Sequence, residues 1–105
     1  MAQYRLEYRD AVGVELSPGS LNVVLDGPWT LERPHVRLLA AAVGVDLSLA
    51  RCRIADVGCW IVRTDRNNLG AGDHPLDVIE IVSSVHLRTT LNLIDGDQVS
   101  VLVEP

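Results

Sequence analysis

The sequence predicts a small, mainly β domain that folds as a closed or nearly closed barrel. Val, Leu and Ile must fill the core, because Phe is absent and the only aromatic residues are two Trp and two Tyr. Such a composition favours strands. Several short segments alternate in polarity, without the regular strand–helix rhythm of a parallel sheet. The 105 residues have room for one domain, residues 1–105, with one modest core.

The composition argues against several classes of partner. The net charge is −5, and all nine basic residues are scattered arginines, whereas nucleic-acid and anionic membrane surfaces need clustered positive charge. No apolar run approaches the roughly 20 residues of a membrane span, and no signal peptide opens the chain. Cys52 and Cys59 lack C-x-x-C spacing, so we expect buried free thiols and a cytoplasmic protein.

The first half of the chain predicts one helix and several strands. The run QYRLEYRDAV places Tyr4, Tyr8 and either Ala11 or Val12 on one helical face, and Gly13 stands where a C-cap would. A turn at 17–20 leads into a strand over 21–25, which the Gly-Pro after Asp26 ends. The Ala-rich middle could suggest helix, but we predict strands over 36–40, 45–54 and 59–63.

The second half predicts a polar loop, a strand, a short helix and a last strand. Residues 64–75 form a Gly-containing loop that is long for a small domain, and such loops often carry function. The run LDVIEIV over 76–82 is a strand. A short helix follows, with a serine of SSVHLRTTL as its N-cap. The Asp95-Gly96 turn then leads into a strand over 99–103.

Two segments together resemble the archaeal-type CTP-dependent riboflavin kinases, which are cradle-loop barrels. SPGSLNVVL at 17–25 follows the family's P-G-T-L-N-L pattern. VIEIVSSVHLRTTLNLIDGDQVSVLV at 78–103 follows its I-E-I strand, L-R helix start and L-K-D-G-D-x-V ending. The resemblance implies a riboflavin kinase, which transfers the γ-phosphate of CTP to the ribityl hydroxyl of riboflavin and gives FMN and CDP with Mg²⁺.

The resemblance also implies roles for particular residues. Ser20, where the family has Thr, and Asn22 would hold Mg²⁺, and Asn22 and Glu80 would be catalytic. Glu80, His74 and Gly72 would contact the flavin, with Gly72 standing where the family has Thr. The nucleotide would contact Val85, His86, Leu87 and Arg88.

Elementary chemistry agrees with these roles. Alternate residues of a strand share a face, so Ser20 and Asn22 can offer two oxygens to one Mg²⁺. Phosphoryl transfer needs positioning and charge neutralisation rather than a protein nucleophile. A helix starting at Ser83–Ser84, with Arg88 nearby, suits an anion. Glu80 could orient a hydroxyl or accept its proton.

Each of these residues also has a plainer interpretation. Ser20 and Asn22 could be ordinary turn and strand residues, and Glu80 an exposed strand carboxylate. Arg88 could be a solvated helix residue and His74 a loop residue. The three histidines of the sequence lack the spacing of a zinc site.

One departure from the family pattern concerns partners and function. The family carries a Gly-rich segment before its first helix, whereas here only three residues precede Tyr4. We therefore expect open strand edges and a homodimer, or a partner chain that completes the barrel. The alternatives are a non-catalytic flavin- or nucleotide-binding or assembly module, and an AbrB-like DNA-binding regulator suggested by LRTTLNLIDGDQVSVL.

Overall fold

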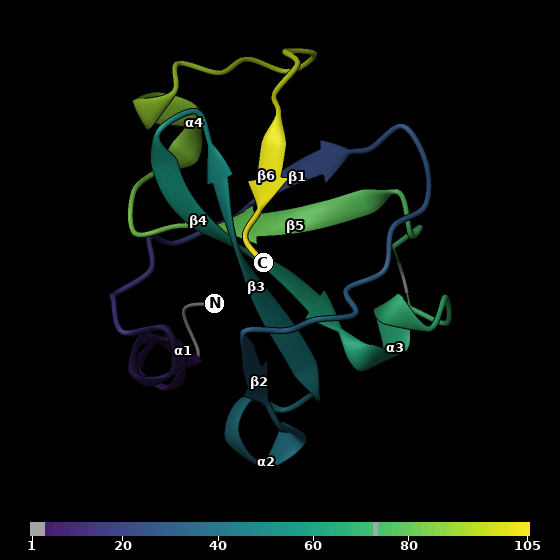
Figure 1. The fold of residues 1–105 in the computed structure, drawn as a ribbon. Coiled ribbons are helices and arrows are strands. Elements are labelled where there is room, and N and C mark those ends of the chain that lie inside the picture. Colours follow the sequence, from purple (N-terminus) through teal and green to yellow (C-terminus); the bar gives the residue numbers. More distant parts are fainter. Residues whose placement is uncertain (1–3, 73) are drawn as a thin grey trace.

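The computed structural model describes residues 4–72 and 74–105, which form a curled antiparallel sheet with short helices at its rim (Figure 1). The mainly β class is therefore confirmed. In chain order the elements are α1 (Arg5–Val12), β1 (Leu21–Val24), β2 (Val36–Leu38), α2 (Ala40–Val43), β3 (Leu47–Ile54), β4 (Val57–Thr64), α3 (Asp65–Asn68), β5 (Val78–Val82), α4 (Leu87–Thr90) and β6 (Val101–Val103).

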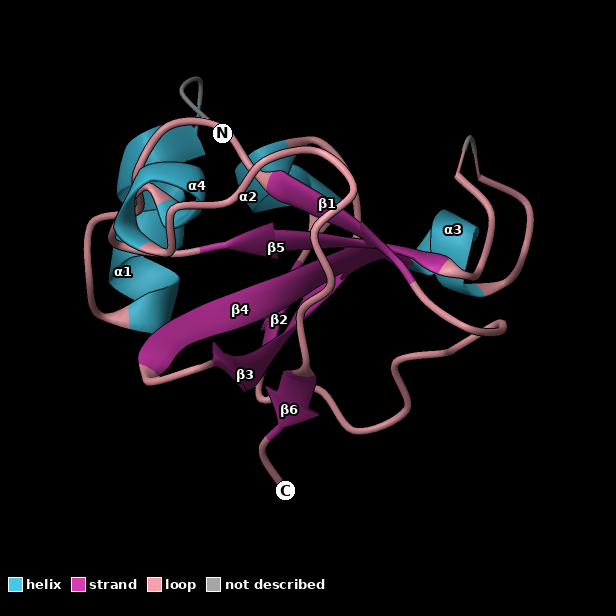
Figure 2. Ribbon diagram, turned by 90° about the horizontal axis from the view of Figure 1, so that it is seen from above, coloured by secondary structure: helices cyan, strands magenta, loops and turns pink. Residues whose placement is uncertain are grey.

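The sheet has the order β1-β5-β4-β3-β2, and β6 also pairs with β3. β2 lies opposite Leu47–Leu49 of β3, and β6 lies opposite Cys52–Ile54 along the same edge. β1 pairs only with β5 in the described part of the chain, so its other edge is open. Figure 2 shows the curl from above. Among the described residues the predicted barrel is thus a half-barrel, open between β1 and β6.

Two hydrophobic clusters lie on the two faces of the sheet. The inner cluster includes Ile61, Ile79 and Ile81, and it continues through Leu87 of α4. The outer cluster includes Leu49, Val62 and Val82, and α1 covers it with Tyr8. Burying a side chain of this size contributes about 1.5–3 kcal/mol. Successive strand residues enter opposite clusters, which is why Ile61 and Val62 are both buried.

The predicted N-terminal helix is confirmed in type and in orientation. α1 ends at Val12, and Gly13 is its C-cap with φ = 85° and an N–H that donates to Arg9 O at 2.8 Å. Tyr4, Tyr8 and Val12 pack on the outer cluster, as the helical spacing predicts. No helix in the described residues has the length and apolar character that a membrane crossing requires.

The prediction for the Ala-rich middle is partly wrong. A strand was expected over 36–40, but β2 ends at Leu38 and the one-turn helix α2 follows. Asp46 Oδ1 accepts the N–H of Ala40 at 2.8 Å, and Gly44 caps the helix with φ = 87°. These local hydrogen bonds outweigh the β pattern. The strand expected over 45–54 therefore begins only at Leu47.

Two predictions around the later helices are also wrong. The loop over 64–75 contains α3, whose N-cap Thr64 accepts the N–H of Asn67 through its hydroxyl at 3.1 Å. The N-cap of α4 is His86 rather than a serine. Ser83 lies four residues before the first residue of α4, and its hydroxyl donates to Gly58 O at 2.8 Å in the neighbouring strand and accepts the N–H of Val85 at 3.4 Å.

The remaining strand boundaries differ by a few residues. The strand expected over 59–63 runs from Val57 to Thr64, because a tight hairpin joins it directly to β3. β1 ends at Val24, β5 begins at Val78 and β6 begins at Val101, so the strands predicted over 21–25, 76–82 and 99–103 are slightly too long.

Candidate functional site

The pairing of β1 with β5 places two of the predicted catalytic residues side by side. Asn22 lies directly opposite Glu80 in the antiparallel register, so both side chains lie on the same face. Val62 of β4 lies opposite Glu80 on its other side. Because Leu21 and Val23 pack on the inner cluster, Asn22 and Glu80 lie on the outer face of the sheet.

A cavity of about 770 Å³ lies beside this pair, and we call it the strand cavity. It is lined by parts of β1, β4 and β5 and by the loop that follows α3. Four of the predicted site residues line it, namely Asn22, Gly72, His74 and Glu80. Its volume lies within the range of about 300–1,000 Å³ that is typical of small-molecule sites.

A smaller cleft of about 80 Å³ lies between the turn before β1 and the start of α4, and we call it the helix cleft. The turn and the segment before α4 are held together because Ser17 N donates to Ser83 O at 2.8 Å. The other five predicted residues line this cleft, namely Ser20, Val85, His86, Leu87 and Arg88. The nine predicted residues therefore divide between two neighbouring cavities.

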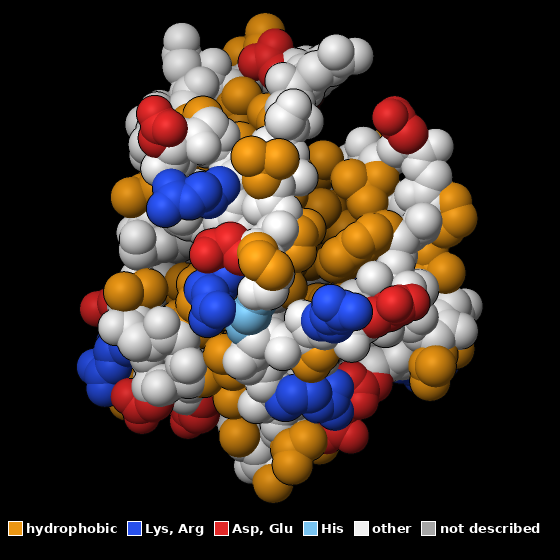
Figure 3. Space-filling model, viewed as in Figure 1, with side chains coloured by type: hydrophobic (Ala, Val, Ile, Leu, Met, Phe, Trp, Pro, Cys, Tyr) orange, Lys and Arg blue, Asp and Glu red, His pale blue; other side chains and the backbone are white. Residues whose placement is uncertain are grey.

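A third cavity of about 710 Å³ marks the open side of the half-barrel, and we call it the edge groove. It runs between β1 and residues 93–100, and both Asn22 and Arg88 also line it. Figure 3 shows hydrophobic side chains gathered in a hollow between β6 and the β1–β2 connection. Val23, Leu93 and Val99 line the edge groove and are half-buried side chains that pack on the inner cluster. The edge groove thus leaves part of the inner cluster open.

The chemistry of Ser20 and Asn22 fits a hard cation. Both are exposed, lie two residues apart and make no side-chain hydrogen bond within the described residues. A hydroxyl and an amide oxygen suit Mg²⁺, which keeps several waters and takes phosphate oxygens. No group of three or more His, Cys, Asp or Glu residues suited to a metal occurs in the described chain. The donor set is therefore compatible with a cation bound mainly through water and phosphate.

The α4 residues differ in what they can offer to a ligand. His86 Nδ1 accepts the N–H of Thr89 at 3.3 Å and contacts its hydroxyl at 2.9 Å, so this ring is occupied as an N-cap. Leu87 is buried in the inner cluster, which leaves only its backbone for contact. Arg88 forms an exposed ion pair with Asp95 at 2.7 Å. Val85 is exposed at the cleft.

The loop after α3 is organised around the buried amide of Asn67. Asn67 Oδ1 accepts the N–H of His74 at 3.0 Å. A Cβ at Gly72 would lie 2.5 Å from Asn67 Oδ1 and 2.7 Å from Asn67 Cα, which no side chain can do. Position 72 therefore has no room for a side chain, so this part of the cavity wall presents only backbone atoms to a ligand.

Ionic contacts fix the base of this loop. Arg37 donates two hydrogen bonds to Asp65 at 2.5 and 2.9 Å and one to Ser48 at 2.9 Å. The Arg37 guanidinium holds the pKa of the Asp65 carboxyl below its usual range. Since Asp65 lines the strand cavity at the start of α3, this contact anchors that helix to β2 and β3.

The sequence prediction missed two residues near the site, Tyr8 and Arg63. Tyr8 was expected only as a packing residue, yet burial and the nearby charge of Glu80 both raise the pKa of its phenol. Arg63 lines the strand cavity and is buried. One signal could have found it: Cys59, Ile61 and Arg63 alternate along β4, so the arginine must point to the same side as two core residues.

Comparison with known proteins identifies the family of this chain. A family model for CTP-dependent riboflavin kinases, described as a domain of unknown function, DUF120, matches residues 1–103. The chain is also similar to several proteins that are named riboflavin kinase. One, from Methanococcoides burtonii, is 55% identical over 109 residues, which cover 96% of this chain and 48% of the relative.

Two further relatives give the same result. A riboflavin kinase from Methanocella arvoryzae is 33% identical over 96% of this chain and 47% of its own length. One from Ignicoccus hospitalis is 30% identical over 95% of this chain and 59% of its own length. The chain thus spans about half the length of these relatives. With its fold and the match over residues 1–103, the chain belongs to the CTP-dependent riboflavin kinase family, DUF120.

Proposed function

We propose that this domain catalyses the phosphorylation of riboflavin by CTP. In this reaction the terminal ribityl hydroxyl oxygen forms a bond to the γ-phosphorus, and the bond from that phosphorus to the β,γ-bridging oxygen breaks. The products are FMN and CDP, and the hydroxyl proton is released. The observation that carries the proposal is the Asn22–Glu80 pair at the rim of the strand cavity, in a chain of this family.

The strand cavity is the proposed riboflavin site. Its volume suits a flavin, and Val62 and Val78 offer apolar surface to the ring. Glu80 lies between Val62 and Asn22, where its carboxylate can accept a hydrogen bond from the ribityl hydroxyl and then its proton. Gly72 and His74 border the same cavity and would contact the flavin from the loop.

The helix cleft and the adjoining surface form the proposed CTP site. The cleft alone is too small for a nucleotide, so CTP would extend from it over the exposed residues Val85 and Arg88. Ser20 and Asn22 would hold Mg²⁺, whose charge would offset that of the phosphates. Since Asn22 of β1 borders the strand cavity and Ser20, just before β1, borders the cleft, residues 20–22 would join the two substrates.

The direct test is an assay for FMN with riboflavin, Mg²⁺ and either CTP or ATP, followed by chromatography. We expect FMN with CTP. A folded preparation that forms no FMN with either nucleotide would contradict the kinase proposal. In Asn22→Ala, kcat should fall by about 10²-fold or more, because charge stabilisation at the phosphates is lost. Riboflavin binding, measured by fluorescence quenching, should persist, and unchanged turnover would refute the metal role of Asn22.

A second candidate function is a flavin-binding module without kinase activity. The small volume of the helix cleft and the pairing of Arg88 with Asp95 favour it, because both leave little to hold a triphosphate. Riboflavin binding without FMN formation, and without binding of CTP, would support this second function.

The edge groove is the proposed site of a homodimer contact or of a strand from a partner chain. The strand β1, with the sequence LNVV, carries no charge or proline to block edge pairing. Val24 is 73% exposed and Ile94 is 72% exposed beside the groove. Size-exclusion chromatography with light scattering tests this proposal, and a well-behaved monomer that binds no second chain would contradict it.

A further inference from the structure

Arg63 is a buried cation with no carboxylate partner among the described residues. It is 3% exposed, and the ion pairs of the described chain do not include it. Burial lowers the pKa of its guanidinium. A buried charge without a counter-ion is unfavourable unless hydrogen bonds compensate for it. The groups that contact the guanidinium of Arg63 must therefore compensate for its buried charge.

Three main-chain carbonyls surround the guanidinium. Nη1 donates to Trp29 O, and Nη2 donates to Leu76 O at 3.2 Å and to Val78 O at 2.8 Å. The guanidinium also lies over the Trp29 ring, 5.4 Å from its centre. Leu76 O additionally accepts the N–H of Trp29 at 3.1 Å. One side chain thus joins the β1–β2 connection to the start of β5.

Two of these carbonyls, those of Leu76 and Val78, belong to segments that carry the proposed flavin contacts. Leu76 follows His74 by two residues, and Val78 precedes Glu80 by two residues in β5. Arg63 borders the strand cavity, although its side chain lies on the inner face of the sheet, opposite to that of Glu80, and it does not border the helix cleft. Its hydrogen bonds therefore hold main-chain atoms close in sequence to both His74 and Glu80, and none of them reaches a residue that lines the helix cleft.

We propose that Arg63 is a positioning residue for riboflavin, which holds the loop wall of the strand cavity at a fixed distance from Glu80. This role rests on the proposed function. Lysine should not replace it, because its three donors share one nitrogen, whereas the planar guanidinium reaches these carbonyls from two separate nitrogens. A shift of about 1 Å in such a wall can cost up to about 10²-fold in binding or rate.

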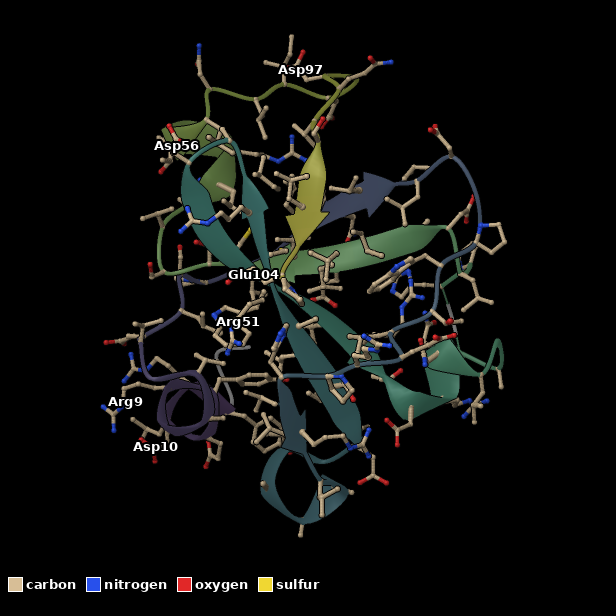
Figure 4. All side chains as sticks on the ribbon, viewed as in Figure 1. Arg9, Asp10, Arg51, Asp56, Asp97 and Glu104 are labelled. Carbon is tan, nitrogen blue, oxygen red and sulfur yellow. The ribbon has the colours of Figure 1, made fainter. Side chains whose placement is uncertain are left out.

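The test compares riboflavin and CTP binding in wild-type protein, Arg63→Lys, Arg63→Met and the control Arg51→Met. Arg51 on β3 is a suitable control because its guanidinium, like that of Arg63, lies over a Trp ring, 5.8 Å from the centre of Trp60. Its side chain is 46% exposed and pairs with Glu104 at 3.9 Å, away from the strand cavity (Figure 4). Riboflavin binding is read by fluorescence quenching and CTP binding by calorimetry.

We expect the Kd for riboflavin to rise at least about 10-fold in Arg63→Lys, while the Kd for CTP stays within about twofold. Arg51→Met should leave both constants unchanged. Arg63→Lys keeps the positive charge, so riboflavin binding can still be compared with wild type if Arg63→Met fails to fold. If Arg63 only stabilised the fold, its substitution would weaken the binding of riboflavin and of CTP together. That outcome, or wild-type riboflavin affinity in Arg63→Lys, would overturn the role of Arg63.

The same data separate this inference from the proposed function. If the folded wild-type chain binds no riboflavin, the proposed function fails and the role of Arg63 fails with it. If wild type binds riboflavin and forms FMN but Arg63→Lys binds equally well, only the inference about Arg63 fails.

Discussion

At the scale of single residues, Gly72 is constrained by its neighbour rather than by its own backbone angles. We predict that Gly72→Ala lowers the free energy of unfolding by about 1–3 kcal/mol, the usual cost of overpacking. The added Cβ would meet the Cα of Asn67, which cannot rotate away. The loop would have to shift, and the hydrogen bond from His74 N to Asn67 Oδ1 would be strained. Urea denaturation measures the change, and riboflavin affinity should fall with it.

Gly58→Ala is the matched control for this prediction. A Cβ at Gly58 would have no heavy atom within 4 Å, and the position lies in β4. Alanine is a better strand residue than glycine, so this variant should be neutral or slightly stabilising. Equal destabilisation of both variants would show that the contact with Asn67 is not the cause.

At the scale of elements, the β3–β4 hairpin contains an unfavourable turn residue. Ile54 pairs with Val57, so the loop consists of Ala55 and Asp56, and Ala55 has φ = 52°. An L-residue in this region costs roughly 1–2 kcal/mol, whereas glycine adopts it freely and loses about 0.5–1 kcal/mol in chain entropy. We predict that Ala55→Gly raises the free energy of unfolding by about 0.5–1 kcal/mol, as urea denaturation would show.

A second Ala→Gly change should have the opposite sign. Ala41 lies exposed in α2, where glycine is less favourable than alanine by about 1 kcal/mol. Ala41→Gly should therefore destabilise the domain. If Ala55→Gly also lowers stability, the turn does not carry the strain inferred for it.

The elements also show which features the sequence could predict. α1 was predictable because the helical spacing of its apolar residues and the C-cap at Gly13 both indicate a short helix that ends at Val12. The hairpin at Ala55 was not, because the turn lacks the Asn-Gly or Asp-Gly signature. The N-cap of α4 was missed because the helix begins only at Leu87, where the ring of His86 accepts the N–H of Thr89. Local signals thus predicted that the strands exist, while short helices and turns without a clear sequence signature decided where they end.

The candidate site follows the same rule. The resemblance named residues that the fold brings to two neighbouring cavities, from β1, β5 and the start of α4. Arg63 was not among them, because its role depends on three carbonyls up to 34 positions away in the sequence. No pattern in the sequence shows which carbonyls will gather around one guanidinium.

At the scale of the whole molecule, the two hydrophobic clusters are protected unequally. α1 covers the outer cluster with Tyr4, Tyr8 and Val12. The inner cluster borders the edge groove, where the sheet is open between β1 and β6 in the described chain. The fully buried centre of the inner cluster nevertheless contains Cys52 and Cys59. These thiols can therefore report whether the open side makes the interior accessible.

We predict that both thiols react with a disulfide reagent only when the domain unfolds. Cys52 is 0% exposed and Cys59 is 3% exposed, and they lie opposite each other on β3 and β4 with their sulfur atoms 3.2 Å apart. The hydrogen bond with Cys59, and then burial, raise the pKa of the Cys52 thiol, and burial shields both sulfur atoms from the reagent. The labelling rate should therefore rise with urea in parallel with global unfolding.

Val24→Cys gives the matched exposed thiol, because Val24 is 73% exposed on the edge strand β1. In that variant one thiol should react at once, while Cys52 and Cys59 stay protected. Riboflavin, if it binds the folded chain, should slow labelling of the buried pair by the factor 1 + [L]/Kd. Rapid labelling of all three thiols in the absence of urea would mean that β3 and β4 separate locally. The half-barrel would then need a partner at the edge groove to keep its interior closed.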